Sequence, residues 1–209
     1  MRYRISKKTG DKISEIGLGS AYMPETPLPK AIAALQRAYE GGINYYDLAA
    51  GDGKAFPMFG EAFAGVRGKI LYQIHFGADY SGGTYGWSLD LDTVKRSIDM
   101  QLKELRTDYI DYGFIHCQDE LADWETYQNR GIFAYILQLK KLGVVRHIGL
   151  SSHTPTVIER ILNDVDVDML MFSINPAYDY GQGSLQTAAP TNGQPFTADV
   201  KRKGSVYRS

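Results

Sequence analysis

The chain has 209 residues, 44% hydrophobic and 22% charged, a composition typical of globular domains that excludes a wholly disordered chain. Its formal net charge is −1, so we expect neither a nucleic acid nor an anionic membrane as a partner. No apolar run approaches the roughly 20 residues that cross a bilayer. The single cysteine, Cys117, excludes a disulfide framework or an iron–sulfur cluster within the chain and favours a reducing, cytoplasmic location.

Hydrophobic periodicity predicts a short hairpin and then strands that alternate with helices. The strands, which are short apolar runs, are predicted at 3–5, 12–14, 16–19, 43–49, 69–75, 109–116, 146–150 and 167–174. The helices, whose apolar residues recur every three or four positions, are predicted at 29–40, 56–63, 91–105, 133–142 and 155–162. Such alternation favours a parallel sheet covered by helices.

Two parallel architectures compete for this pattern. A doubly wound sheet usually carries a glycine-rich turn after its first strand, and here Gly17 and Gly19 lack the third glycine. A barrel places polar residues at the carboxyl ends of its strands. Four successive strands end in this way, at Asp47, His75, His116 and 151–153. We therefore predict an α/β fold, a TIM-type (β/α) barrel with an N-terminal β-hairpin.

The barrel prediction covers residues 1–180 and leaves it incomplete, with about six of the usual eight strand–helix units. Residues 181–209 lose all periodicity and are rich in Gly, Pro, Ser, Thr, Gln and Asn, so we expect a disordered or degenerate tail. Either the chain is truncated, or it forms an open sheet whose unpaired edges favour self-association.

Five stretches of the sequence resemble the aldo/keto reductase family. They are EIGLGS at 15–20, GGINYYDLA at 41–49, LRTDYIDYGFIH at 105–116, LKKLGVVRHIGLSSH at 139–153 and VDMLMFSINP at 167–176. The resemblance covers about residues 1–178 and implies a (β/α)8 barrel that transfers hydride between NADP or NAD and a small-molecule carbonyl substrate. It is closest to a subgroup that normally carries a C-terminal ferredoxin-like iron–sulfur segment, whose cysteines this chain lacks.

The resemblance also implies catalytic roles. The family uses an aspartate, a lysine, a tyrosine and a histidine; Asp47 matches the aspartate and His116 matches the histidine. His75 stands at the lysine position and Asp52 at the tyrosine position. Because an ionised aspartate has no proton to donate at neutral pH, His75 becomes the candidate acid beside Asp47 and His116. Asp52, flanked by glycines, fits an ordinary turn.

Cofactor-binding residues follow from the same resemblance: Gly19, Ser20, Asp47, Ser151, Ser152 and Asn175. Ser151 matches the family's serine that holds the nicotinamide carboxamide, whereas Ser152 stands where asparagine is usual. Tyr80 and Tyr85, in the loop at 76–89, are further candidates for the pocket wall. No spacing of His, Cys, Asp or Glu predicts a metal site.

Three functions remain open for this sequence: a reductase, a non-catalytic barrel fragment or ligand- and partner-binding domain, and a truncated product without stable function. Because two of the four family residues are replaced, we expect little carbonyl reductase activity, with turnover below ~1 s⁻¹.

Overall fold

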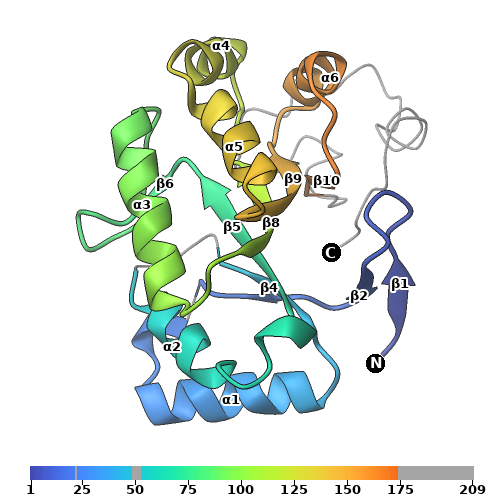
Figure 1. The fold of residues 1–209 in the computed structure, drawn as a ribbon, viewed down its shortest axis with the longest axis vertical. Coiled ribbons are helices and arrows are strands. Elements are labelled where there is room, and N and C mark those ends of the chain that lie inside the picture. The colour runs from blue at the N-terminus through green and yellow to red at the C-terminus, as the bar shows by residue number, and fades with distance from the viewer. Residues whose placement is uncertain (22, 49–52, 174–209) are drawn as a thin grey trace, which may run out of the picture.

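The computed structural model describes residues 1–21, 23–48 and 53–173 (Figure 1). Within these residues, six parallel strands form one sheet in the order β10–β9–β8–β5–β4–β3. They are β3 (Leu18–Gly19), β4 (Tyr45–Asp47), β5 (Leu71–Phe76), β8 (Ile110–Ile115), β9 (Val145–Ser151) and β10 (Met169–Met171). Each strand pairs with its successor, as in a barrel wall, whereas a doubly wound sheet reverses its strand order.

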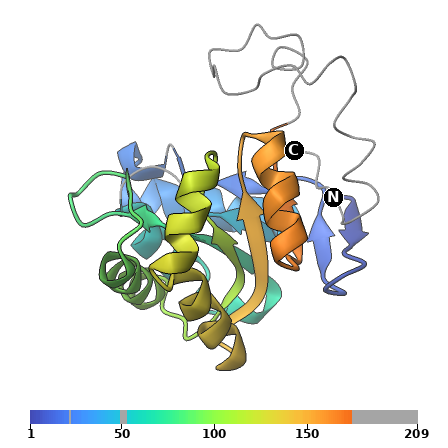
Figure 2. The same ribbon diagram turned by 90° about the horizontal axis from the view of Figure 1, so that it is seen from above.

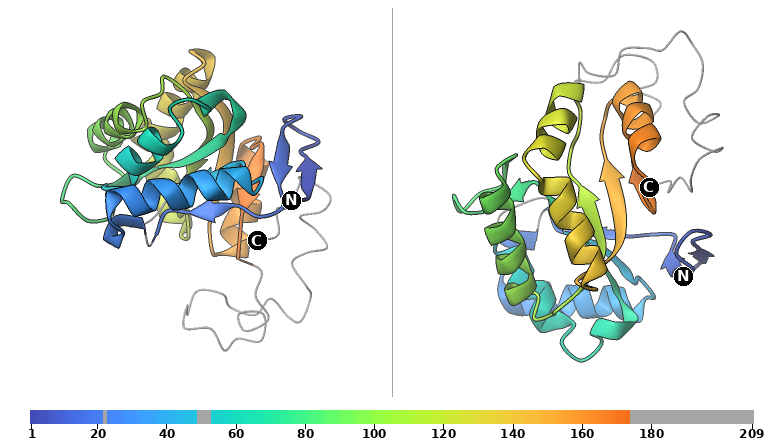
Figure 3. Two further views of the ribbon diagram at one scale, coloured as in Figure 1. Left: turned by 90° about the horizontal axis from the view of Figure 1, so that it is seen from below. Right: turned by 45° about the horizontal axis from the view of Figure 1, so that its top comes forward.

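Helices connect these strands and surround the outer side of the curved sheet (Figures 2 and 3). They are α1 (Leu28–Glu40), α2 (Ala55–Ala62), α3 (Leu91–Glu104), α4 (Leu121–Asn129), α5 (Ile132–Lys141) and α6 (Pro155–Asp164), with 3-10 turns η1 (Met23–Glu25) and η2 (Arg67–Lys69). Among the helices described, none has the length and apolar character needed to cross a membrane.

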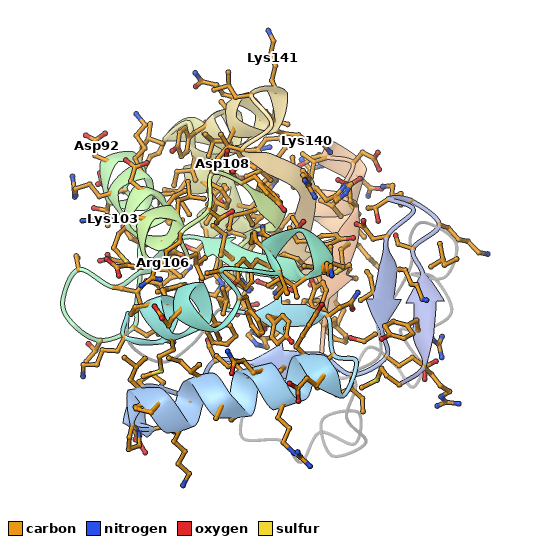
Figure 4. All side chains as sticks on the ribbon, turned by 60° about the horizontal axis from the view of Figure 1, so that its bottom comes forward. Asp92, Lys103, Arg106, Asp108, Lys140 and Lys141 are labelled. Atoms are coloured by element: carbon orange, nitrogen blue, oxygen red, sulfur yellow. The ribbon has the colours of Figure 1, made fainter. Side chains whose placement is uncertain are left out.

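Helix α3 shows how local sequence fixes the ends of an element. Asp90 caps its first turn, because its carboxylate accepts the backbone N–H of Thr93 at 2.8 Å. Asp92 lies in the first turn and Lys103 in the last (Figure 4), so each charge lies at the helix end whose dipole it complements. Val94 and Ile98 occupy the buried face, as their spacing predicts.

Side chains of the strands alternate between two faces. Tyr46, Tyr72 and Ile74 are fully buried in the main core between sheet and helices. Tyr45 and Tyr112 belong to a second, smaller cluster on the opposite, inner face. The inner face therefore has its own packed centre, which a barrel interior requires and a one-sided sheet lacks.

Contacts across the inner face show that the sheet curls. The Tyr45 hydroxyl on β4 lies 3.1 Å from Sδ of Met169 on β10, and the Gln73 amide on β5 lies 3.7 Å from Sδ of Met171. Three strands separate β4 from β10 in the sheet, so a flat arrangement would hold them about 19 Å apart. The predicted incomplete barrel is therefore confirmed for the described residues.

The amino-terminal end of this barrel wall is covered by the hairpin of β1 (Tyr3–Ile5) and β2 (Lys12–Ser14). Its turn reaches the interior, where the hydroxyl of Tyr112 donates to Asp11 at 2.5 Å and lies 3.0 Å from the hydroxyl of Thr9. Lys8, in the same turn, pairs with Asp166, two residues after the end of α6. The hairpin thus closes one end of the barrel interior, so a functional site is expected at the opposite end.

Two parts of the structure differ from the sequence prediction. Helix α4 has only Trp124 and Tyr127 buried, which is too few for a readable helical stripe. The predicted loop at 76–89 contains a hairpin of β6 (Ala78–Asp79) and β7 (Gly86–Trp87), whose two-residue strands are too short to show alternation. The predicted tail at 181–209 and the last residue of the predicted strand 167–174 lie outside the described residues.

Candidate active site

The carboxyl ends of β4, β5, β8 and β9 bring the predicted polar residues to one end of the sheet. Asp47 is the last residue of β4, His75 precedes the last residue of β5, His116 follows β8, and Ser151 ends β9. The register pairs Asp47 with Gln73, two residues before His75, so all three share the inner face. This end lies opposite the hairpin.

Four side chains form a continuous hydrogen-bonded series at this end. His75 Nε2 lies 3.0 Å from Asp47 Oδ1, and His75 Nδ1 lies 2.9 Å from His116 Nδ1. His116 Nε2 lies 2.6 Å from the hydroxyl of Tyr85, which comes from the loop between β6 and β7. We call Asp47, His75, His116 and Tyr85 the relay.

The amide of Gln73 fixes one end of the relay. Its Nε2 lies 3.1 Å from Asp47 Oδ1 and 2.7 Å from His75 Nε2, and its Oε1 accepts the Tyr45 hydroxyl. Gln73 Nε2, His75 Nε2 and Asp47 Oδ1 form a nearly equilateral triangle. The two N–H bonds of the Gln73 amide diverge too widely to point at both His75 Nε2 and Asp47 Oδ1. The carboxylate is the stronger acceptor, so both Gln73 and His75 Nε2 donate to Asp47.

This assignment sets every other bond of the relay. With its proton on Nε2, neutral His75 accepts at Nδ1, so His116 donates from Nδ1. Neutral His116 then accepts at Nε2, and the hydroxyl of Tyr85 donates to it. All three hydrogen bonds therefore point the same way, from Tyr85 through the two imidazole rings to the Asp47 carboxylate.

Burial keeps His116 and Tyr85 uncharged. Burial, together with the neighbouring His75 and His153 rings, holds the pKa of His116 well below its usual range. Burial, together with the Cys117 thiol and the Asp119 carboxyl, raises the pKa of Tyr85 to about 12. At neutral pH His116 is therefore a neutral imidazole and Tyr85 an intact phenol.

A second polar cluster borders the relay on the loops after β8 and β9. Asp119 accepts a hydrogen bond from the backbone N–H of His153 at 2.6 Å, from the ring Nδ1 of His153 at 2.9 Å, and from the hydroxyl of Ser152 at 3.1 Å. Burial alone would raise the pKa of Asp119, but these hydrogen bonds bring it below its usual value. The hydrogen bond to Asp119 raises the pKa of His153. Hydrogen bonds between Asp119 and His153 thus join the two loops.

The hydroxyl of Ser151 is used within the protein. Its Oγ accepts the backbone N–H of Cys117 at 3.0 Å and donates to the carbonyl of Ile115 at 3.4 Å. Cys117 has φ of 45°, in the left-handed region that a side chain disfavours, and this contact holds it there. Ser151 therefore fixes the turn that carries His116, while its assignment to the cofactor stays a prediction.

The other predicted cofactor residues are placed as follows. Gly19 is exposed at the end of β3, with open space where a Cβ would stand, and Ser20 is buried beside it. Asn175 and Asp52 lie outside the described residues. Within the described part of the chain, no group of three or more His, Cys, Asp or Glu side chains is arranged to hold a metal ion.

Sequence reasoning missed two residues of this site. Gln73 has a detectable signal, because it stands two positions before His75 and therefore shares its face. Gln118 has none: it is fully buried two residues after His116, and its Oε1 is a buried acceptor without a hydrogen-bond partner in the described residues. Such an acceptor suits an amide N–H, which the nicotinamide carboxamide of a cofactor offers.

Comparison with known proteins agrees with this architecture. The family model described as "Aldo/keto reductase family" matches residues 15–198. An uncharacterized oxidoreductase, YqkF of Bacillus subtilis, is 30% identical over 84% of this chain and 56% of its own length. L-glyceraldehyde 3-phosphate reductase of Escherichia coli is 27% identical over 78% of this chain and 48% of its own length.

Solved structures give the same result. Aldo-keto reductase AKR11C1 of Bacillus halodurans, in its holo form, superposes with a TM-score of 0.70 at 27% identity, over 83% of this chain and 58% of its own. A putative aldo-keto reductase of Pseudomonas aeruginosa shares the fold, with a TM-score of 0.75. The chain spans about half the length of the curated relatives it matches. On this evidence the chain belongs to the aldo/keto reductase family.

Proposed function

We propose that this protein is an oxidoreductase that transfers hydride between a nicotinamide cofactor, NADP or NAD, and a small carbonyl substrate. The observation that carries the proposal is the series Asp47–His75–His116 at the carboxyl ends of three adjacent barrel strands. Barrel enzymes place their catalytic residues at that end. The names of relatives that reduce L-glyceraldehyde 3-phosphate or methylglyoxal support a small aldehyde as substrate.

The residues at this end fit a nicotinamide cofactor. Gln118 offers a buried acceptor for the carboxamide, and Gly19 leaves open space beside the sheet. We propose these two, with Ser20, Asp47, Ser151, Ser152 and Asn175, as the cofactor-binding residues. The bound cofactor would supply the hydride, and the protein must then supply a proton to the carbonyl oxygen.

The proton is the part of the reaction that the described residues explain. Asp47 holds the His75 ring in one tautomer, and His75 in turn sets the tautomer of His116. A carboxylate that orients an imidazole in this way also stabilises the extra proton when the ring receives one. Asp47, His75 and His116 therefore hold and transfer a proton without the family's lysine, whose position His75 occupies.

Binding and turnover test the proposal directly. Titration of the chain with NADPH and with NADH, followed by nicotinamide fluorescence, should saturate. Oxidation of the bound cofactor with small aldehydes or quinones should be measurable but slower than ~1 s⁻¹, the low end of ordinary enzymes. We expect His75→Ala to abolish it.

His147→Ala is the matched control, because His147 lies 3.3 Å from Asp11 at the hairpin end. It should leave the rate unchanged. Absence of cofactor binding would contradict the proposed function and favour a binding domain. Full activity in His75→Ala would leave the reductase standing and refute the role of His75.

Two further properties belong to the same proposal. The single cysteine supports a cytoplasmic location. Strands β3 and β10 are the edges of the described sheet, and an edge strand offers backbone groups to a second copy, so we propose self-association. Light scattering over a range of protein concentrations would measure it, and a constant monomer mass would contradict it.

A further inference from the structure

We infer that Tyr85 is the residue that exchanges the proton with the carbonyl substrate, and that His116, His75 and Asp47 act behind it as a proton relay. This inference rests on the proposed function and names the acid that the function needs. Tyr85 lies in the β6–β7 loop, far in sequence from the position where the family resemblance expects a tyrosine.

Accessibility selects Tyr85 as the outer end of the relay. His75 is 1% exposed and His116 is 4% exposed, so both rings are almost completely covered by neighbouring side chains. Tyr85 is 41% exposed, and its hydroxyl also contacts His116 at 2.6 Å. Among the four relay side chains, Tyr85 alone therefore combines a half-exposed ring with a direct bond to a buried imidazole.

The bonding of His116 supports the same choice. Its Nδ1 is bonded to His75 and its Nε2 to Tyr85, so both ring nitrogens are occupied. Donation of a proton from His116 to a carbonyl would require breaking the shortest hydrogen bond of the relay. Tyr85 has no such limit, because its oxygen can accept a proton from His116 through a lone pair while its one O–H donates to a substrate.

Packing holds the Tyr85 ring in place although its loop is on the surface. The ring stands perpendicular to His116, with ring centroids 5.8 Å apart, and lies edge-on to Tyr80 at 6.2 Å. Tyr80 is buried against Phe56 of α2. The two tyrosines therefore anchor the hairpin over the relay, as a proton donor requires.

The proton count of the relay fits a reversible reduction. In the orientation derived above, Tyr85 donates to His116, and the Asp47 carboxylate carries no proton. With one added proton, His75 carries a proton on both ring nitrogens and still shares the one on Nε2 with Asp47, while the other two bonds reverse. His75 then donates to His116 from Nδ1, His116 donates to Tyr85 from Nε2, and the Tyr85 hydroxyl is free to point at a substrate.

Reduction then balances. The hydride adds to the carbonyl carbon, the carbon–oxygen π bond breaks towards oxygen, and that oxygen takes the proton of Tyr85. Tyr85 takes the proton of His116 Nε2, and His116 takes the proton of His75 Nδ1. The remaining proton stays between His75 and Asp47, so the relay returns to the derived orientation with one proton fewer. Alcohol oxidation runs the same steps backwards.

The raised pKa of Tyr85 keeps the phenol protonated at rest and makes it a weaker acid, so His116 must replace the proton as it leaves. The lowered pKa of His116 keeps that ring from holding two protons. A phenol that keeps its proton until the transition state is a donor and not a resident phenolate. A ring that does not hold two protons passes each one on. The titratable groups facing the relay from the β8 and β9 loops are Cys117, Asp119 and His153.

The test compares Tyr85→Phe with Tyr3→Phe in the full chain. Both changes remove one hydroxyl from an exposed tyrosine and keep the ring; the hydroxyl of Tyr3 donates to the backbone carbonyl of Gly42 at 2.8 Å, at the hairpin end of the barrel. We expect Tyr85→Phe to lower kcat by ~10²–10⁴-fold with little change in KM, as loss of a positioned acid does. Tyr3→Phe should stay within about threefold of the wild type.

Nitrogen-15 NMR of labelled histidines reads the relay without turnover. In the resting protein, His116 should be protonated at Nδ1 and not at Nε2, and Tyr85→Phe should shift the Nε2 resonance towards that of a free, non-protonated nitrogen. Protonation at Nε2 in the resting protein, or an Nε2 resonance unmoved by Tyr85→Phe, would overturn the relay.

The two readouts separate the inference from the proposed function. Full kcat in Tyr85→Phe would refute the role of Tyr85 and leave the reductase standing. A wild type that transfers no hydride would refute the reductase, and the histidine spectra would still decide whether the relay exists.

Discussion

Asp111 is predicted to be the most sensitive carboxylate for stability, although it lies far from the site. It is 1% exposed at the start of β8, where it accepts the backbone N–H of Tyr72 at 2.9 Å. Arg67 and Arg146 pair with its two oxygens at 2.8 and 3.1 Å. Asp111→Asn keeps the shape and the bond to Tyr72 but removes the charge that both guanidinium groups face.

Burial of the partners sets the size of the effect. Removing one member of a buried ion pair costs ~3–5 kcal/mol, because the other charge stays buried and uncompensated. The Arg146 side chain is 52% exposed and can turn to water, whereas that of Arg67 is 12% exposed. Arg67 also keeps its stacking on the Tyr109 ring, 4.0 Å from its centroid. We therefore expect the lower end, ~3 kcal/mol.

Urea unfolding at pH 7 and calorimetry measure the loss. A chain of this size should lose ~2–4 °C in Tm per kcal/mol, so Asp111→Asn should lower Tm by ~6–12 °C. Asp92→Asn is the matched control, since the Asp92 side chain is 76% exposed and pairs with Lys95 only at 3.8 Å. It should change stability by less than ~0.5 kcal/mol. A loss below ~1 kcal/mol for Asp111→Asn would show that the ion pairs of Asp111 with Arg67 and Arg146 do not stabilise the fold as proposed.

Two further changes follow from single contacts. Gly60→Ala should destabilise the protein by ~1–3 kcal/mol in urea unfolding, because the new Cβ would stand 2.2 Å from the backbone oxygen of Glu104 where α2 meets α3; wild-type stability would contradict this packing. The Asp119–His153 pair should stabilise the fold most at about pH 4–6.5. The stability from the lowered pKa of Asp119 is lost as the pH falls through that pKa. The stability from the raised pKa of His153 is lost as the pH rises through that pKa. Wild type minus His153→Ala in urea should therefore be larger at pH 5.5 than at pH 9, by ~1 kcal/mol or less, and an equal difference at both would refute it.

The architecture was readable from the sequence because its signals are local. Strand–helix alternation, and polar residues after apolar runs, placed Asp47, His75 and His116 at one end of one sheet. Helix α4 was not predicted, since its polar sequence has no apolar stripe and its two aromatic rings are buried by tertiary packing. Gln73 follows from alternation once His75 is chosen.

The rest of the site depends on tertiary placement. The sequence gives no distance between Tyr85 and His116, which are 31 positions apart and meet only because the β6–β7 hairpin folds over β8. Similarly, motif matching assigns Ser151 to the cofactor. A motif does not reveal that the Ser151 hydroxyl makes hydrogen bonds to the backbone of Cys117 and Ile115. Hydrogen-bond partners, unlike strand ends, are decided by loops whose paths no periodicity records.

Isotope transfer tests the central claim most directly. The chain would be incubated with a small aldehyde and NADPH or NADH carrying deuterium at both C4 positions of the nicotinamide ring, and the alcohol product examined by mass spectrometry. Hydride transfer predicts one deuterium on the former carbonyl carbon, formed by the wild type and not by His75→Ala. An alcohol without deuterium, or no alcohol at all, would contradict the assignment of this barrel end as a reductase site.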